Sequence, residues 1–308
     1  MIIQGNALDV LKTLDSESVD CCVTSPPYWG LRNYGVEGQL GLEPTFQEYI
    51  QKLCDIFDEV KRVLKQEGTC FVNLGDCYAG SGKGIGTDRT KCKEVYTDDD
   101  IAKTDWSMTG LPDKSLCQIP SRFSIEMADR GWILRNEIIW HKPNCMTSSA
   151  KDRFTVDFEK VFFFVKNKKY YFDAEAISEP KQESSINRVK YPRFTANNKG
   201  YSGQYAVVGI DYSETEKLKL TRNKRTVWTI STQSVNEAHF ATFPEDLVVP
   251  MIKAGCPEGG TVLDPFFGAG TTGLVAKKLF RNYIGIELNP EYVTMAERRI
   301  EGQCGGLF

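Results

Sequence analysis

The segment Asp264–Gly273 has the sequence DPFFGAGTTG and decides the fold class of this chain. An apolar stretch at Thr261–Asp264 precedes the glycines, a helix-like stretch at Thr271–Phe280 follows them, and Glu287 ends the next apolar stretch. Glycines spaced Gly-x-Gly-x-x-Gly between a strand and a helix let a ligand approach the backbone, and an acid after the following strand suits two ribose hydroxyls. The pattern predicts a strand–turn–helix–strand unit that binds a nucleoside cofactor.

Two observations separate this unit from an NAD site. Few of the 308 residues follow Gly273, so the remaining βα units of the sheet can only come from the N-terminal part of the chain. Asp264, Phe266 and Phe267 suit the ammonium, sulfonium and adenine of S-adenosylmethionine, whereas a carboxylate repels a pyrophosphate. We therefore expect a circularly permuted fold. An NAD-dependent oxidoreductase is the alternative function. The other alternative is that the glycine turn binds no ligand and is needed only for helix–strand packing.

The composition is that of a globular protein, with 41% hydrophobic and 26% charged residues. The net charge is -3 and the pI about 5.7, so any nucleic-acid surface has to be local. The chain has neither an apolar run of about 18 residues nor a signal-like start, which predicts a cytoplasmic protein without a membrane segment. Ten scattered cysteines without a Cys-x-x-Cys pair, and only two histidines, predict no metal site. Both a monomer and a homodimer are compatible with these data.

The apolar spacing predicts alternating strands and helices, and hence an α/β fold. Strands are expected at Ser18–Thr24, Thr69–Asn73, Ile133–Trp140, Val161–Val165, Thr261–Asp264 and Tyr283–Glu287, with Ile133–Trp140 and Val161–Val165 as the last pair of the sheet. Helices are expected at Phe46–Gly68 (Gly68 as C-cap), Ile119–Arg130, Pro244–Ala254, Thr271–Phe280 and Pro290–Ile300.

Two segments interrupt this alternation. Residues 79–114 are rich in Gly, Ser, Thr and charge, which predicts a long mobile loop. Between Lys168 and Thr226, twelve basic and seven acidic side chains give a net +5, interleaved with tyrosine and phenylalanine. This mixture is typical of nucleic-acid contacts. We predict a catalytic part at 1–167, a target-recognition region at 168–236 and a cofactor-binding part at 237–308.

A second motif, Ser25-Pro26-Pro27-Tyr28, follows the first expected strand. With Asp264–Gly273 behind it, the chain resembles the S-adenosylmethionine-dependent amino-methyltransferases of DNA, in particular their permuted β group. The resemblance covers nearly the whole chain. It implies a doubly wound Rossmann-like methyltransferase sheet, circularly permuted, with an inserted DNA target-recognition region.

The tetrapeptide suits methylation of an exocyclic amine. The lone pair of such an amine is delocalised into the base, and acceptors facing its two hydrogens favour a pyramidal nitrogen. Ser25 Oγ and the Pro26 carbonyl can be these acceptors, with the prolines fixing the backbone. Tyr28 can stack on a base that has been flipped out of the duplex.

The serine in the first position of the Ser-Pro-Pro-Tyr motif indicates which base is methylated. In the family, Ser-Pro-Pro-Tyr accompanies cytosine N4 more often and Asp-Pro-Pro-Tyr adenine N6, so we expect N4-cytosine, with N6-adenine as the alternative. Methylation at cytosine C5 needs a cysteine nucleophile, typically after proline, and no proline here precedes a cysteine.

The resemblance also implies the partners and the remaining site residues. Partners are double-stranded DNA and a cognate restriction endonuclease, unless the enzyme is solitary. The residues expected to bind S-adenosylmethionine are Asn6, Phe240, Thr242, Phe243, Asp264, Phe266, Phe267, Gly268, Gly270, Thr271, Thr272 and Glu287. Within the basic region itself, Arg188, Arg222 and Arg225 are expected to bind DNA, because arginine side chains can make bidentate contacts with bases.

Overall fold

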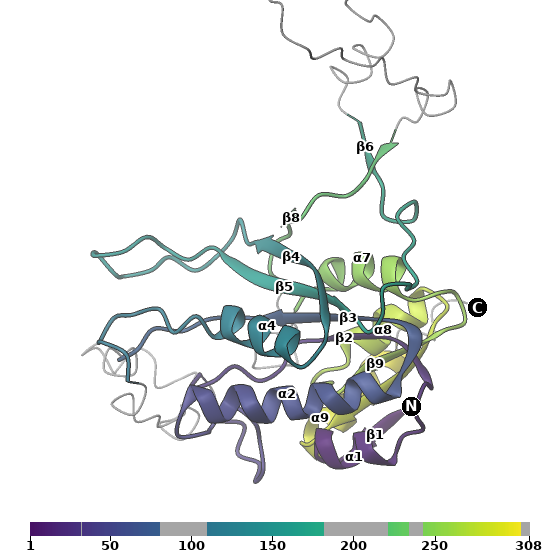
Figure 1. Ribbon diagram of the computed structural model, residues 1–308, viewed down its shortest axis with the longest axis horizontal. Coiled ribbons are helices and arrows are strands. Elements are labelled where there is room, and N and C mark those ends of the chain that lie inside the picture. Colours follow the sequence, from purple (N-terminus) through teal and green to yellow (C-terminus); the bar gives the residue numbers. More distant parts are fainter. Residues whose placement is uncertain (32, 81–109, 182–220, 234–242, 303–308) are drawn as a thin grey trace, which may run out of the picture. The chain divides into compact units, whose positions relative to one another are not determined.

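The computed structural model describes residues 1–31, 33–80, 110–181, 221–233 and 243–302. The chain divides into a larger unit, Met1–Phe172 with Thr226–Phe308, and a smaller unit, Asp173–Arg225. A sheet of eight strands, in the order β1-β10-β9-β2-β3-β5-β4-β8, runs through the described part of the larger unit (Figure 1). Its strands are β1 Ile2–Gln4, β2 Val19–Thr24, β3 Leu64–Leu74, β4 Ile133–His141, β5 Phe158–Val165, β8 Val227–Thr229, β9 Thr261–Asp264 and β10 Asn282–Glu287.

The strand order shows the circular permutation. β1, β10, β9, β2 and β3 are mutually parallel, and β5 is antiparallel to both β3 and β4. The N-terminal strand β1 pairs with the C-terminal strand β10, and β2 pairs with β9. A chain that began at β9 and continued from α9 into β1 would wind through the same sheet without interruption. The sheet order reverses between β9 and β2, which is where open α/β sheets bind ligands.

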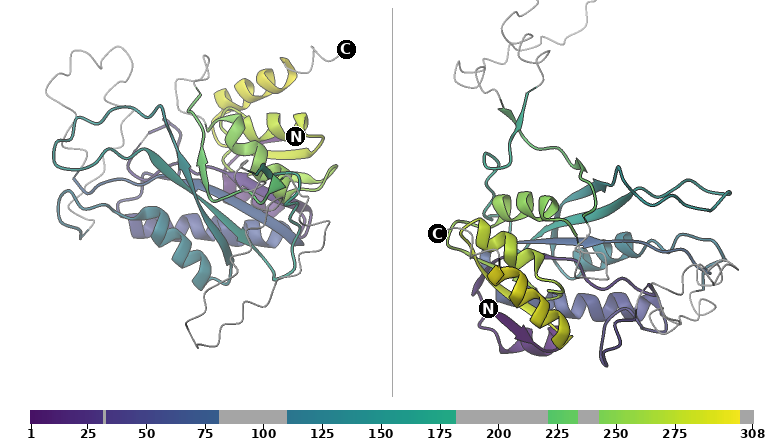
Figure 2. Two further views of the ribbon diagram at one scale, coloured as in Figure 1. Left: turned by 90° about the horizontal axis from the view of Figure 1, so that it is seen from above. Right: turned by 180° about the vertical axis from the view of Figure 1, so that it is seen from behind.

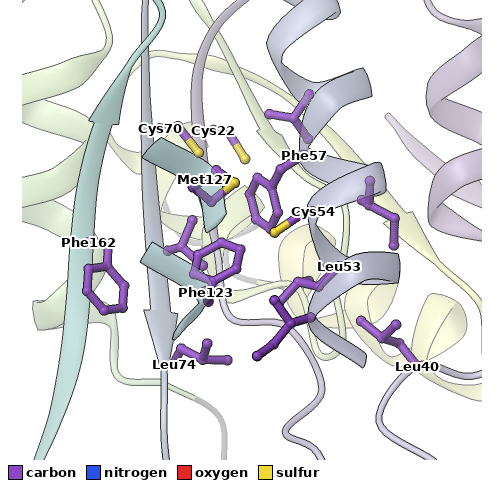
Figure 3. Packing of buried hydrophobic residues seen from close by; sticks show 14 of the residues in the cluster. Cys22, Leu40, Leu53, Cys54, Phe57, Cys70, Leu74, Phe123, Met127 and Phe162 are labelled. Atoms are coloured by element: carbon purple, nitrogen blue, oxygen red, sulfur yellow. The ribbon is translucent and has the colours of Figure 1, made fainter. Parts of the chain in front are cut away.

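Helices cover both faces of the sheet, as Figures 1 and 2 show. They are α1 Ala7–Thr13, α2 Phe46–Val63, α4 Ile119–Asp129, α7 Glu245–Gly255, α8 Thr271–Lys278 and α9 Pro290–Gly302. The first three share one hydrophobic cluster with the sheet, and α7 and α8 belong to another. In the first cluster, Phe57 of α2 packs edge-on against Phe123 of α4, with ring centroids 5.3 Å apart (Figure 3).

Two sequence-based expectations about these elements are wrong. The second helix ends at Val63, with Leu64 as its cap, and not at Gly68. The pairing of β2 with β3 jumps from Val19–Leu64 to Cys21–Thr69, so the turn signal around Gly68 belongs to a bulge in the strand. β4 and β5 were expected to be the last two strands of the sheet, but β8 pairs with β4 and forms the edge. With three residues, β8 is too short to show a periodicity.

The smaller unit contains a two-stranded antiparallel ribbon of β6 Glu179–Pro180 and β7 Thr221–Arg222. Most of this unit, and residues 81–109 of the loop expected at 79–114, lie outside the described residues. The boundaries predicted for the recognition region remain a prediction. Among the described residues, no helix is long and apolar enough to cross a membrane.

Candidate active site

A cavity of about 1050 Å³ opens at the carboxyl ends of the parallel strands of the larger unit. The predicted site residues that line it are Asn6, Ser25, Pro26, Pro27, Tyr28, Phe243, Phe266, Phe267, Gly268, Thr271 and Glu287. Apart from Phe243, which precedes α7, these residues follow or end strands on one edge of the sheet, because parallel strands bring their carboxyl ends together. The two motifs, more than 200 residues apart in the chain, therefore face one cavity.

Asp264, the last residue of β9, connects the two motifs through hydrogen bonds. Its carboxylate accepts hydrogen bonds from Thr24 Oγ1 at 2.6 Å, from Thr272 Oγ1 at 2.7 Å and from the Phe266 amide at 3.0 Å. Burial raises its pKa to about 6, although these hydrogen bonds oppose the shift. Asp264 is 1% exposed and does not line the cavity, so its geometry fits a residue that shapes the glycine turn.

The glycine turn and Glu287 form one rim of the cavity. Gly270 has φ +77°, and a Cβ on it would lie 2.9 Å from Ala296 Cβ of α9, so both conformation and packing require glycine. Gly268 donates its amide to Glu287 Oε2 at 2.7 Å, and Asn289 donates to Oε1 at 2.8 Å. Burial raises the pKa of Glu287.

The two phenylalanines of the turn have different surroundings. Phe267 is 3% exposed and stacks on Tyr283, with ring centroids 5.8 Å apart. Cβ atoms on Gly273 or Gly285 would lie about 2.5 Å or closer to its ring, so these glycines make room for it. Phe266 is only partly buried and also lines the cavity. Of the two, Phe266 is therefore the better placed to contact a ligand ring.

These residues fit S-adenosylmethionine. A Cβ on Gly268 would meet no atom within 4 Å, so the turn leaves open space beside its backbone. Each Glu287 oxygen already accepts one amide and retains a second lone pair for a ribose hydroxyl. Phe266 offers an aromatic face to an adenine. Asn6 lines the same cavity and caps α1, accepting the Leu8 amide at 3.0 Å.

On the other side of the cavity, Asn73 organises the Ser-Pro-Pro-Tyr motif. Its Nδ2 donates to the Lys160 carbonyl at 3.2 Å, which turns its Oδ1 toward the motif. Oδ1 accepts from Ser25 Oγ at 3.4 Å and lies 3.3 Å from the Tyr28 hydroxyl oxygen. Because the Ser25 proton is directed to Asn73, the lone pairs of Ser25 Oγ are left for a donor in the cavity.

The Tyr28 hydroxyl has one proton, which it donates to Glu159 Oε2 at 2.7 Å, while Glu159 Oε1 accepts from the Lys142 ammonium. Burial first, and then the Glu159 carboxylate, raise the pKa of Tyr28 well above its ordinary value. The phenol therefore stays protonated and acts as a donor. Trp29, beside the motif, lies in the core and donates its indole N–H to the Glu43 carbonyl at 2.8 Å.

Gly75 provides a test of the Tyr28 position. A Cβ there would lie 2.4 Å from Tyr28 Cε2 and 2.9 Å from Cδ2, so an alanine has to displace the ring. We expect Gly75→Ala to lower kcat by about 10- to 100-fold, because misplacement by about 1 Å is costly in catalysis. Calorimetry should show unchanged affinity for S-adenosylmethionine. Gly302→Ala, whose Cβ would meet no atom within 4 Å, is the control. Full activity of Gly75→Ala would contradict a fixed Tyr28 ring.

The remaining predicted residues do not line this cavity. Gly270 is the N-cap of α8, Thr272 lies in the first turn of that helix, and both are buried. Phe240, Thr242 and Arg188 lie outside the described residues. Arg222 and Arg225 belong to the smaller unit, where Arg222 approaches Glu179 at 3.5 Å and Arg225 is exposed.

Sequence reasoning left out several polar residues of the cavity: Asn73, Lys142, Glu159 and Asn289. Asn73 had a usable signal, since it lies near the end of the strand next to β2. Glu159 had none, because it begins a strand whose reversed direction the sequence does not reveal. Within the described residues, no group of three or more His, Cys, Asp or Glu side chains could hold a metal ion.

Comparison with known proteins identifies the family. A family model described as DNA methylase, covering N6 and N4 methyltransferases, matches residues 19–298. The chain belongs to this family. Three Type II methyltransferases are similar over nearly the whole chain: M.XycI of Xanthomonas campestris pv. cyanopsidis (40% identity, covering 100% of this chain and 89% of that protein), M.Cfr9I of Citrobacter freundii (41%, 98% and 88%) and M.SmaI of Serratia marcescens (39%, 97% and 90%).

Solved structures share the fold at low sequence identity. The PvuII DNA methyltransferase (cytosine-N4-specific) aligns with a TM-score of 0.63 and 21% identity, covering 97% of this chain and 85% of that one. A DNA modification methylase of Thermus thermophilus, TTHA0409, complexed with S-adenosyl-L-methionine, aligns with a TM-score of 0.59 and 20% identity, covering 99% and 96%. The predicted permuted, Rossmann-like methyltransferase fold is confirmed. The protein is a site-specific DNA amino-methyltransferase whose methyl donor is S-adenosylmethionine.

Proposed function

We propose that the methylated group is the N4 amine of cytosine in double-stranded DNA. The observation that carries this proposal is the neutral side chain of Ser25 in the first position of the motif, which lines the cavity. Ser25 Oγ is held by the Asn73 amide, with no carboxylate in the first position of the motif. In the resembling family, this serine accompanies cytosine N4 more often than adenine N6.

The residues divide the reaction between them. The target base is flipped into the cavity, where Tyr28 stacks on it. Ser25 Oγ and the Pro26 carbonyl accept from the two amine hydrogens, which directs the nitrogen lone pair toward the neighbouring turn. Phe266, Gly268 and Glu287 would hold S-adenosylmethionine there, and its sulfonium would supply the methyl group. The N–C bond would form as the S–C bond breaks, S-adenosylhomocysteine would leave, and one amine proton would pass to solvent. Catalysis then depends on the alignment of the two ligands.

The expected product can be identified directly. Plasmid DNA is incubated with the protein and methyl-labelled S-adenosylmethionine, digested to nucleosides and analysed by mass spectrometry. We expect labelled N4-methylcytosine, and a reaction without protein is the control. Labelled N6-methyladenine would replace the proposed base while leaving the pocket and the cofactor in place.

Adenine N6 is the second candidate for the methylated group, because both amines fit the same acceptor arrangement.

We further propose that the region 168–236 recognises a short DNA sequence, since it carries a net +5 between Lys168 and Thr226. Arg222 and Arg225 contribute to this charge, and the Arg225 side chain is exposed. The Type II names of the relatives support pairing with a cognate restriction endonuclease.

A further inference from the structure

A chain of polar contacts continues from the Ser-Pro-Pro-Tyr motif into the neighbouring hairpin. Glu159 Oε2 accepts from the Tyr28 hydroxyl at 2.7 Å, and Oε1 accepts from the Lys142 ammonium. The Lys142 nitrogen also lies 4.4 Å from the centroid of the Trp140 ring. The Glu159 and Lys142 side chains are each 18% exposed, and both line the cavity. Glu159 therefore bridges Tyr28 and a largely buried cation.

The backbone fixes the position of this pair. Glu159 lies opposite Trp140 in the antiparallel ladder of β4 and β5. Lys142 follows the last residue of β4, and its amide donates to the Asp157 carbonyl at 2.7 Å. Both side chains thus start from hydrogen-bonded backbone on the edge that carries Ser25. The paired charges also limit the cost of burying the carboxylate.

Tyr28 needs such a partner for its proposed role. Stacking on a flipped base requires one ring orientation, and a phenol held only by a 3.3 Å contact to Asn73 Oδ1 is weakly fixed. A hydrogen bond to a carboxylate is shorter and stronger than one to a neutral group. Glu159 provides that bond, and the Lys142 ammonium holds the carboxylate from its other oxygen.

We propose that Glu159 is a positioning residue for methyl transfer, which acts through the Tyr28 hydroxyl and is itself held by Lys142. This proposal rests on the proposed contact between Tyr28 and the target base. Glu159 acts through Tyr28 in this proposal, because its two oxygens are already engaged by the Tyr28 hydroxyl and the Lys142 ammonium. Its effect should therefore appear in kcat and disappear when the Tyr28 hydroxyl is absent.

The test is a double-mutant cycle of Glu159→Ala and Tyr28→Phe, with kcat measured as methylated nucleoside formed. We expect Glu159→Ala to lower kcat about 10- to 100-fold, as loss of a charge-assisted hydrogen bond predicts. In the Tyr28→Phe background, the same change should have an effect of less than about threefold. Glu159→Gln keeps an acceptor for the phenol and should restore most of the activity. Calorimetry should show unchanged affinity for S-adenosylmethionine in all variants.

Glu137→Ala is the matched control, since Glu137 forms an ion pair with Lys160 on the same hairpin and does not line the cavity. Independent, multiplying effects of Glu159→Ala and Tyr28→Phe would overturn the proposal, as would normal kcat in Glu159→Ala. Both results leave the methyltransferase function intact. Failure of the proposed function shows up separately, as wild-type protein that forms no N4-methylcytosine.

Discussion

Ser25→Ala is expected to lower kcat for DNA methylation about 100- to 1000-fold while leaving affinity for S-adenosylmethionine unchanged. The magnitude is that seen when one preorganised polar group facing a reacting centre is removed. Ser25 lies on the base side of the cavity, and its side chain donates a 3.4 Å hydrogen bond to Asn73 Oδ1. Loss of so long a bond should change the free energy of unfolding little, so the effect is confined to chemistry. Single-turnover methylation with labelled cofactor measures it, and calorimetry measures cofactor affinity.

Ser18→Ala is the control for Ser25→Ala. Ser18 precedes the same strand at its opposite end, where its hydroxyl donates to the Asp15 carbonyl at 2.7 Å. Its loss removes a shorter hydrogen bond far from the cavity and should leave kcat at the wild-type value. If Ser25→Ala retains more than about a third of the wild-type kcat, the hydroxyl is not an acceptor for the amine.

The geometry of the glycine turn could be predicted from the sequence because its contacts are local, whereas its contacts with the cofactor remain a prediction. Gly268, Gly270 and Glu287 lie within about 20 residues of one another, in one strand–turn–helix–strand unit whose geometry the glycine spacing largely determines. The circular permutation followed from the same unit, since too little chain remained after it to complete a sheet. Both inferences used the positions of residues along the chain and needed no long-range pairing.

The base side could be predicted only in part, because it depends on strand direction. Ser25 and Tyr28 carry their own signal in a proline-fixed turn. Glu159 reaches Tyr28 because β5 runs antiparallel to β3 and thus begins at the edge where its neighbours end. Apolar periodicity identifies a strand but not its direction, so the polar residue at the start of β5 could not be assigned to the cavity.

The role of Asp264 illustrates a third reason why sequence alone does not determine the site. Its position at the end of β9 was predicted correctly, but a direct contact with the cofactor ammonium is not what its surroundings favour. Thr24, 240 residues earlier, and Thr272 occupy its oxygens instead. A buried acid and a ligand-binding acid have the same signature in sequence, and only its hydrogen-bond partners separate them.

Asp264→Ala is accordingly expected to weaken S-adenosylmethionine binding by about 100-fold or more, through the turn that Asp264 holds. The change leaves the Thr24 hydroxyl and the Phe266 amide without their acceptor, at about 1–3 kcal/mol for each group, and leaves Thr272 Oγ1 only the Val23 carbonyl at 3.4 Å. Calorimetry measures the affinity and thermal unfolding the stability. Asp20→Ala is the matched control, because Asp20 accepts the Thr261 amide at the opposite end of β9. It should lose stability but keep the cofactor, whereas unchanged affinity in Asp264→Ala would exclude the turn as the binding element.

Asp264→Asn adds a pH dependence with a defined sign. Burial raises the pKa of Asp264 from 3.8 to about 6, so between these values the folded protein binds a proton that the unfolded chain releases. The stabilisation from this site is fully present below about pH 4 and is lost as the pH rises through about 6. Asparagine does not titrate, so the free energy of unfolding of the wild type should fall by roughly 2 kcal/mol relative to Asp264→Asn between about pH 4 and 7. Denaturant titrations of both proteins across this range measure the difference. A constant difference would mean that the carboxyl is ionised in the folded protein throughout, and that the two threonines and the Phe266 amide stabilise its charge better than burial destabilises it.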